Sequence, residues 1–95
     1  MIKLNQILDC VAENFELDIQ KILGPSQKRE ICEARFFFCL ISRNLTARTL
    51  ESIGNHINRD HCTVLHGIRK ANDLIDIYPE MKSLYNKIIN EISVE

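Results

Sequence analysis

Residues 43–72 constrain the fold of this 95-residue chain more than any other segment, because they have the pattern of two short helices joined by a turn. The first helix is predicted from about Ala47 to Asn55. It is expected to stop at Gly54, a residue that tolerates the left-handed conformation of a sharp exit. The second is predicted to begin between Asn58 and Asp60, whose short polar side chains can accept hydrogen bonds from the free amides of a first turn. The segment therefore predicts a helix-turn-helix over about residues 47–75.

The second helix of this pair is predicted to be amphipathic. Apolar residues recur at the three-to-four-residue spacing of one buried helix face. They are Val64, Leu65, Ile68, Ala71 and Ile75. The opposite face collects Cys62, Thr63, His66, Arg69 and Lys70. Hydroxyl, imidazole and cationic groups on one helix face are typical of a surface that enters the major groove of DNA.

The same residues resemble the C-terminal DNA-binding domain (domain IV) of the DnaA family of bacterial replication initiators. The family has a leucine-rich helix, an Ile-Gly pair, a short loop, then Arg-Asp-His-Thr-Thr-Val-Leu-His and a basic pair. This chain has Ile53-Gly54, the run Arg59 to His66 with one exception, and Arg69-Lys70. The segment Ile22 to Leu40 parallels the family as well, so the resemblance covers roughly Leu4 to Leu74. It implies an all-α fold, a compact helical domain with a helix-turn-helix of the DnaA domain IV or Trp-repressor-like type.

Base contacts are expected from the start of the second helix, since the N-terminal residues of a recognition helix lie toward base edges. Asp60 can accept from a cytosine amino group, and His61 can donate or accept depending on its tautomer. Thr63 can meet a thymine methyl group or a phosphate. The resemblance likewise implies that Asp60, His61 and Cys62 contact bases. Asp60 also has the simpler interpretation of a helix cap, which is compatible with base contact.

Other residues are expected along the DNA backbone. The resemblance implies that those near it are Arg43, Thr46, Leu50 and Thr63. Phosphate charge is expected from Arg59 and Lys70, and His66 lies on the same face. The resemblance also implies that an upstream loop places a cation in the minor groove, where A·T-rich tracts concentrate negative potential. Ungapped alignment sets Gln27 opposite the family's arginine, which leaves Lys28 or Arg29 to serve.

The chain departs from the family at Gln27, at Cys62 in place of threonine, and in the turn Asn55 to Asn58, which is one residue shorter. The Cys62 replacement, the small number of basic residues in the loop and the acidic flanks of the chain support a rival hypothesis, a protein-interaction module that kept the fold but does not bind DNA. Its contact surface would be the apolar stripe on a final helix predicted at about residues 79–93. That stripe comprises Met81, Leu84, Tyr85, Ile88, Ile89 and Ile92. Ordinary closure of the core is the other account of the stripe, and the one we prefer.

Charge is unevenly distributed along the chain. Residues 28–70 carry eight basic and four acidic side chains, whereas the remainder carries four basic and nine acidic ones, within an overall net charge of −1. Neutralisation of phosphates supplies most non-specific affinity for DNA, so positive charge concentrated in the helix-turn-helix region favours binding there. A solvated charged surface without a partner is the alternative interpretation of this pattern.

The rest of the chain is predicted to be helical and to form one domain over residues 1–95. The apolar spacing predicts an N-terminal helix ending near Asn14 and a short second helix, Asp18 to Leu23, capped by Asp18. A central helix is predicted over Glu30 to Ile41. Pro79 is expected to start the last helix, because proline suits a first helical position.

Several classes of protein are excluded by what the sequence lacks. It has no Gly-rich phosphate loop, nucleophile-base pair or paired carboxylates, so we expect no enzyme, bound nucleotide or cofactor. Without an apolar run of about 18 residues or a signal-peptide pattern, a cytoplasmic, nucleoid-associated protein is expected, not a membrane protein. By resemblance, it would bind double-stranded DNA as a monomer.

The cysteines at positions 10, 32, 39 and 62 form no CxxC pair and fit no common zinc pattern. Cys32 and Cys39 are seven residues apart on a predicted helix and are interpreted as small buried apolar residues. The group His61, Cys62 and His66 could in principle hold a metal. We expect none, because the resemblance accounts for both histidines and three ligands on a solvent face would form a weak site.

Overall fold

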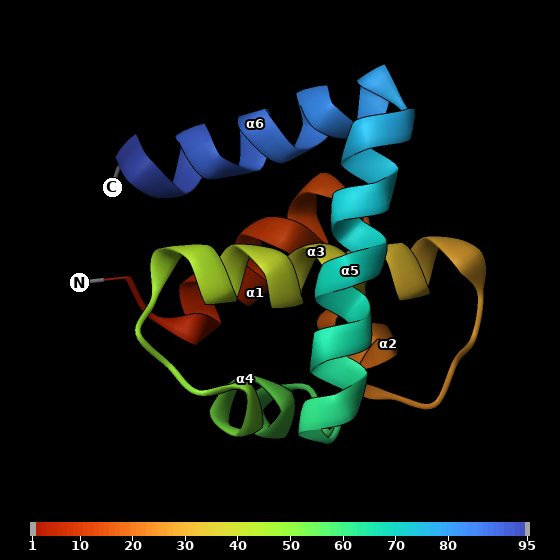
Figure 1. Cartoon of the computed structure of the whole chain (residues 1–95), viewed down its shortest axis with the longest axis vertical. Helices are drawn as coiled ribbons and strands as arrows, with labels where there is room; N and C mark the ends of the chain where they lie inside the picture. The colour runs from red at the N-terminus through yellow and green to blue at the C-terminus, as the bar shows by residue number, and fades with distance from the viewer. Residues whose placement is uncertain (1, 95) are drawn as a thin grey trace.

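The computed structural model describes residues 2–94, with the side chains of residues 2–93, and these residues form an all-α fold of six helices (Figure 1). In chain order the helices are α1 (Leu4–Asn14), α2 (Ile19–Leu23), α3 (Arg29–Leu45), α4 (Leu50–His56), α5 (His61–Ile77) and α6 (Pro79–Val94). The predicted fold class is thereby confirmed. None of these helices is long and apolar enough to cross a membrane.

Helix α3 lies at the centre of the molecule and packs against α1, α2, α4 and α5. Phe37 and Phe38 on successive positions are both fully buried, because α3 has neighbours on more than one side. The helix is longer than the predicted Glu30 to Ile41 and continues to Leu45. α1 buries the predicted stripe against α3 and α6, and α2 begins after Asp18, whose carboxylate accepts from the Gln20 amide at 2.9 Å.

Helix α5 crosses α3 through small side chains. Val64 and Ala71 are fully buried, and Gly67 lies so close to α3 that a Cβ atom there would be 3.4 Å from Cys39 Sγ. The expectation that Leu65 belongs to this face is wrong, since its side chain is 41% exposed. Leu65 lies about 100° around the helix from Val64, at the edge of the face that packs against α3.

The turn of the helix-turn-helix differs from the predicted one. Helix α4 begins at Leu50, three residues after the predicted Ala47, because the Thr49 side chain accepts a hydrogen bond from the Ser52 amide at 3.0 Å and caps the helix. Gly54 lies inside α4 and has no positive φ. The left-handed residue is Asn58, with φ 59°. Helix α5 was predicted to begin between Asn58 and Asp60, and Asp60, the last of these residues, is its N-cap before the first helical residue, His61.

Helix α6 closes the core above α1 and α5 (Figure 1). Ile88 and Ile92 are buried, and the rest of the predicted apolar stripe is partly buried against the same core. The stripe therefore closes the core, which was the account of it that we preferred on the basis of the sequence. Beside the α5–α6 corner, Ile77 is 65% exposed and Tyr78 is 39% exposed.

Candidate nucleic-acid interface

The start of helix α5 presents a row of polar side chains to solvent. Asp60, the N-cap, accepts a hydrogen bond from the Thr63 amide at 2.8 Å. That bond, with smaller contributions from the Thr63 side chain and the Cys62 amide, lowers the pKa of Asp60. His61, Cys62 and Thr63 follow, and all are exposed. The structure thus brings the four predicted base-reading residues together on one accessible helix end.

His61 and Cys62 also interact with each other. The Cys62 sulfur lies 3.6 Å from His61 Nε2, so each side chain restricts the orientation of the other. Within the described residues, no three His, Cys, Asp or Glu side chains gather into a group that could hold a metal. None of the four cysteines forms a disulfide, and Cys39 is buried as predicted whereas Cys32 is only partly buried.

A small hollow of about 180 Å³ separates the recognition helix from the upstream loop. Thr63 and His66 line it from α5, and Gln27 lines it from the loop. The His66 ring packs edge-on against Phe36 of α3, with centroids 6.1 Å apart, so one side of this exposed histidine is supported by the protein. The loop and the start of α5 therefore lie side by side.

Arg59 has a different place from the one predicted. Its guanidinium group donates to the backbone oxygens of Ile57 and Asn58, both at 3.1 Å, and to that of Gly24 at 2.7 Å. The side chain is accordingly half-buried within the turn. A cation held by three carbonyl groups is poorly placed to reach out to a phosphate. This position is better explained as part of the joint between the loop and the turn.

The remaining cations of the upstream loop lie at the start of α3. Lys28 is the exposed N-cap residue of α3, and Arg29 is the first helical residue. Arg29 Nε lies 3.4 Å from a carboxylate oxygen of Glu33, yet the arginine side chain is 78% exposed. Arg29 and Lys70 of α5 line one shallow depression. Arg29 of α3 and Lys70 of α5 thus face the same depression, and Lys28 directly precedes Arg29 in the chain.

On the other side, Arg43, Thr46 and Leu50 lie in and beside the connection between α3 and α4. Arg43 is exposed in the last turn of α3, and Leu50 is partly exposed at the start of α4. The Thr46 hydroxyl donates to the Ser42 carbonyl at 2.7 Å and accepts from the Arg48 amide at 3.3 Å. Thr46 is therefore held in a fixed orientation beside the exposed Arg48.

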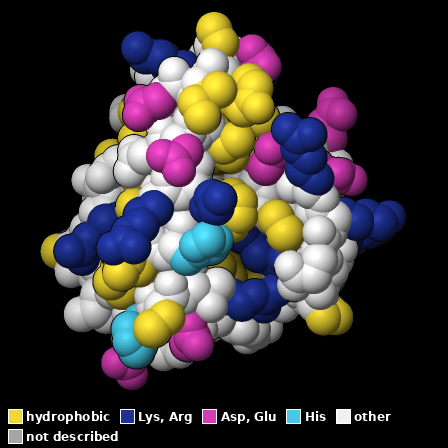
Figure 2. All heavy atoms as spheres, turned by 45° about the vertical axis from the view of Figure 1, so that its right-hand side comes forward, with side chains coloured by type: hydrophobic (Ala, Val, Ile, Leu, Met, Phe, Trp, Pro, Cys, Tyr) yellow, Lys and Arg dark blue, Asp and Glu magenta, His cyan; other side chains and the backbone are white. Residues whose placement is uncertain are grey.

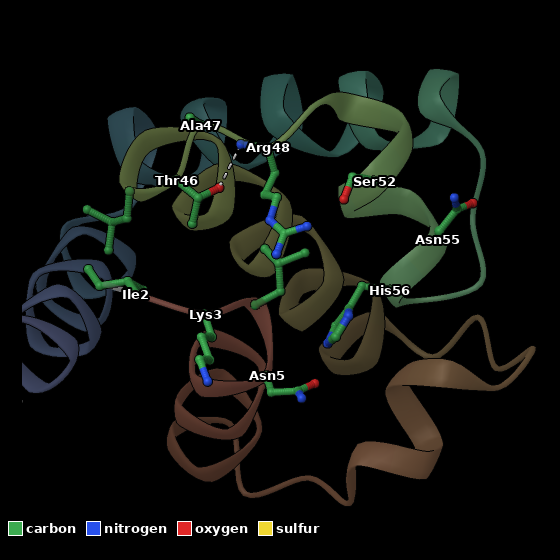
Figure 3. A pocket seen from close by; sticks show the side chains of 11 residues that line it. Ile2, Lys3, Asn5, Thr46, Ala47, Arg48, Ser52, Asn55 and His56 are labelled. Atoms are coloured by element: carbon green, nitrogen blue, oxygen red, sulfur yellow. Dashed lines mark hydrogen bonds between the residues drawn. The ribbon is translucent and has the colours of Figure 1, made fainter.

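An open groove of about 920 Å³ runs from this connection to the N-terminal segment (Figure 3). Figure 3 shows the Arg48 side chain extending over the groove, with Lys3 on the opposite wall and His56 beside them. Arg48 is a candidate for contact with the DNA backbone, and it was not among the site residues predicted from the sequence. Its position two residues after Thr46 in a basic segment is the signal that could have identified it.

The charge on this side of the molecule follows the sequence pattern. Figure 2 shows Lys and Arg side chains across the middle of the face beside a histidine, Asp and Glu around apolar side chains toward the upper end, and further Asp and Glu side chains near a second histidine at the lower end. That upper end is the end of α5 and the start of α6, where Asp73, Asp76 and Glu80 are exposed. An anion would be attracted to the middle of this face and repelled from its upper end.

Comparisons with known proteins match the part of the chain that contains the helix-turn-helix. Residues 4–71 match the family model described as the bacterial dnaA protein helix-turn-helix. The chain is similar to the chromosomal replication initiator protein DnaA of Neisseria meningitidis and Neisseria gonorrhoeae, with 36% identity over 84 residues, 87% of this chain. The corresponding protein of Cereibacter sphaeroides is 32% identical over 75 residues, 78% of this chain. In each case the matched segment spans 16% of the relative's length.

Proposed function

Because this chain belongs to the family of bacterial DnaA helix-turn-helix domains, we propose that it binds double-stranded DNA in a sequence-specific manner. The matched module is a helix-turn-helix and not an enzyme domain, so the activity to be explained is recognition. Asp60, His61 and Cys62, together with Thr63, are the proposed contacts to DNA in the major groove. The observation that carries the proposal is their exposure together at the N-terminal end of a helix with basic flanks.

The proposed docking places the start of α5 in the major groove with α4 across the DNA backbone. Arg43, Thr46, Leu50 and Arg48 would then lie along one strand. Lys28 and Arg29 would reach the neighbouring minor groove on the other side, and Lys70 and His66 would lie between the two sites. Asp60 would serve both as the cap of α5 and as an acceptor for a base amino group, roles that are compatible because its pKa is lowered.

The biological role proposed for this binding is replication initiation, its regulation, or transcriptional control. It rests on the family and on relatives named as chromosomal replication initiator proteins. The chain matches a small part of those relatives, so the proposal concerns DNA binding alone. We further propose that it binds as a monomer, in the cytoplasm, at one asymmetric DNA site.

The test begins with selection of a preferred duplex from random DNA, followed by fluorescence anisotropy at low salt with that duplex and a scrambled duplex of equal composition. We expect tighter binding to the selected duplex and loss of the preference in His61→Ala. The exposed Lys87→Ala on α6 serves as the matched control and should bind like the unmodified protein. Absence of binding to any duplex would reject the proposal and favour the protein-interaction module.

A further inference from the structure

Two arginines from different parts of the chain donate to the same carbonyl oxygen. The Gly24 oxygen accepts from Arg35 Nη2 at 2.8 Å and from Arg59 Nη2 at 2.7 Å. Arg35 belongs to α3, Arg59 belongs to the turn before the recognition helix, and Gly24 is the C-cap residue of α2, where the upstream loop starts. One backbone atom thus connects the loop, the central helix and the turn.

Arg35 is committed entirely to this connection. A guanidinium group has five N–H donors, and all five of those on Arg35 have partners. The partners are the backbone oxygens of Lys21, Ile22, Gly24 and Ser26 and the sulfur of Cys32. The residue is buried with 6% of its surface exposed. Arg35 therefore fixes the path of the backbone from α2 into the loop and has no donor left for a ligand.

Arg59 extends the same network to the turn. It holds the carbonyl groups of Ile57 and Asn58 while it also holds Gly24. The Asn58 side-chain amide donates to the Leu23 oxygen at 3.3 Å, which adds a second connection between the turn and the end of α2. The residues that immediately precede Asp60 are thus joined directly to those that immediately precede the basic loop.

The electrostatics of this joint are unusual, because two cations converge and no carboxylate among the described residues forms an ion pair with either of them. Burial, and then the nearby charge of Arg59, lower the pKa of Arg35. Hydrogen bonds from ionised donors are stronger than neutral ones, and the seven that reach backbone oxygens from the two side chains compensate the cost of this arrangement. A lysine cannot replace such a group, since it has no planar fork of donors.

We propose that Arg59, through its shared acceptor with Arg35, is a positioning residue that sets the distance between the basic loop and the start of α5. This inference rests on the proposed function, because that distance is the spacing between the minor-groove and major-groove contacts. A loop held in register allows both grooves to be contacted at once. A loose loop permits each contact separately and lowers discrimination between DNA sequences.

The experiment compares Arg59→Lys with Lys87→Arg, a replacement that also keeps the charge, at an exposed cation of α6 outside the proposed contacts. Amide hydrogen exchange on the free proteins measures order at Gly24 and Lys28, and anisotropy measures affinity for the selected and scrambled duplexes. For Arg59→Lys we expect faster exchange at both amides and a loss of discrimination of at least about tenfold, comparable to a single mismatched base pair. Its affinity for the scrambled duplex and its dependence on salt should stay unchanged, because the positive charge is kept.

A phosphate contact by Arg59 would behave differently, with normal exchange and normal discrimination in Arg59→Lys, and that result would overturn the inference. Simple destabilisation would weaken binding to both duplexes equally and would also overturn it. Asn58→Gly provides a second variant that suits the left-handed backbone and removes only the bond to Leu23. Asn58→Gly should also speed exchange at the Gly24 and Lys28 amides and reduce discrimination between the duplexes, each by a smaller factor than Arg59→Lys. If no duplex is bound by the unmodified protein, the proposed function fails, while the exchange measurements still decide whether Arg59 holds the loop.

Discussion

The carbonyl oxygen of Arg59 lies well within 3.0 Å of the point where a Cβ atom on Gly54 would be, closer than side chains in proteins approach. The Arg59 amide also donates to the Gly54 oxygen at 2.8 Å. Gly54 is therefore required for the close return of the chain after α4, and not for a left-handed exit. The turn can be short because the backbone that leaves α4 passes directly over this glycine.

Gly54→Ala should destabilise the fold by about 1–3 kcal/mol, because the added methyl group forces backbone to move at the turn. Gly67→Ala is the matched control, since a Cβ atom there would meet Cys39 Sγ and Phe36 Cδ1 at the ordinary distance of 3.4 Å. The control should be neutral or gain up to about 1 kcal/mol from helix propensity. Urea denaturation of both variants measures the difference. Equal stability would mean that the close return is not needed.

Ile88→Ala should cost about 2–5 kcal/mol, since Ile88 is fully buried and α6 is part of the common core. Ile89→Ala, at the adjacent and only partly buried position, should cost less. Thermal unfolding followed by circular dichroism checks both values. Had α6 served mainly as a docking surface, Ile88→Ala would leave stability nearly unchanged.

Stability should depend on the ionisation of Asp60. Because the folded state lowers the pKa of this carboxyl group, its contribution is complete above the unfolded pKa and is lost as pH falls through the folded pKa. An asparagine at this position would cap the helix without a charge. The stability advantage of the unmodified protein over Asp60→Asn should therefore shrink between about pH 5 and about pH 3, roughly one unit either side of an ordinary aspartate pKa. Urea denaturation across this range measures it. A constant difference would show that the charge plays no part in the cap.

DNA should protect Cys62 from alkylation. Cys62 is exposed at the proposed base-reading end of α5, whereas burial raises the pKa of the Cys39 thiol to about 12 and keeps it unreactive. Iodoacetamide labelling followed by peptide mass spectrometry should show rapid modification at Cys62, slowed by the selected duplex, and little at Cys39 with or without DNA. Unchanged labelling of Cys62 in the bound state would place the DNA elsewhere.

Lys28→Gln and Lys70→Gln should each reduce the slope of log affinity against log salt by about 0.9, the value for one phosphate contact. Lys82→Gln on α6, at the other end of the molecule from the start of α5, is the control and should not change the slope. Anisotropy titrations over a series of salt concentrations provide the data. A slope that is the same in all three variants would refute the assignment of these lysines.

Much of the fold could be predicted because local rules act within each helix. Apolar spacing predicted the buried stripes of α1 and α6, and short polar residues predicted the caps Asp18 and Asp60. The row from Asp60 to Thr63 was predicted to be accessible as soon as α5 was assigned, because the start of a helix and its polar face follow from sequence alone.

The differences from the predictions have two causes. Some are local: Thr49 caps α4 three residues after its predicted start, and Leu65 lies about 100° around α5 from Val64, so it is exposed. Others come from contact between segments distant in the sequence. Arg59 was expected to add phosphate charge, and its hydrogen bond to Gly24 joins it to a residue 35 positions earlier. Spacing along one helix contains no information about that contact.

The sequence by itself determined the helices, their caps and the family resemblance, because these depend on neighbouring residues and on a run of side chains preserved in order. The tertiary structure decided which cations are free and which are structural, and how the loop is placed beside the recognition helix. Those features depend on the convergence of Arg35 and Arg59 on the oxygen of Gly24. A backbone carbonyl is present at every residue, so its role as an acceptor emerges only when the chain has folded around it.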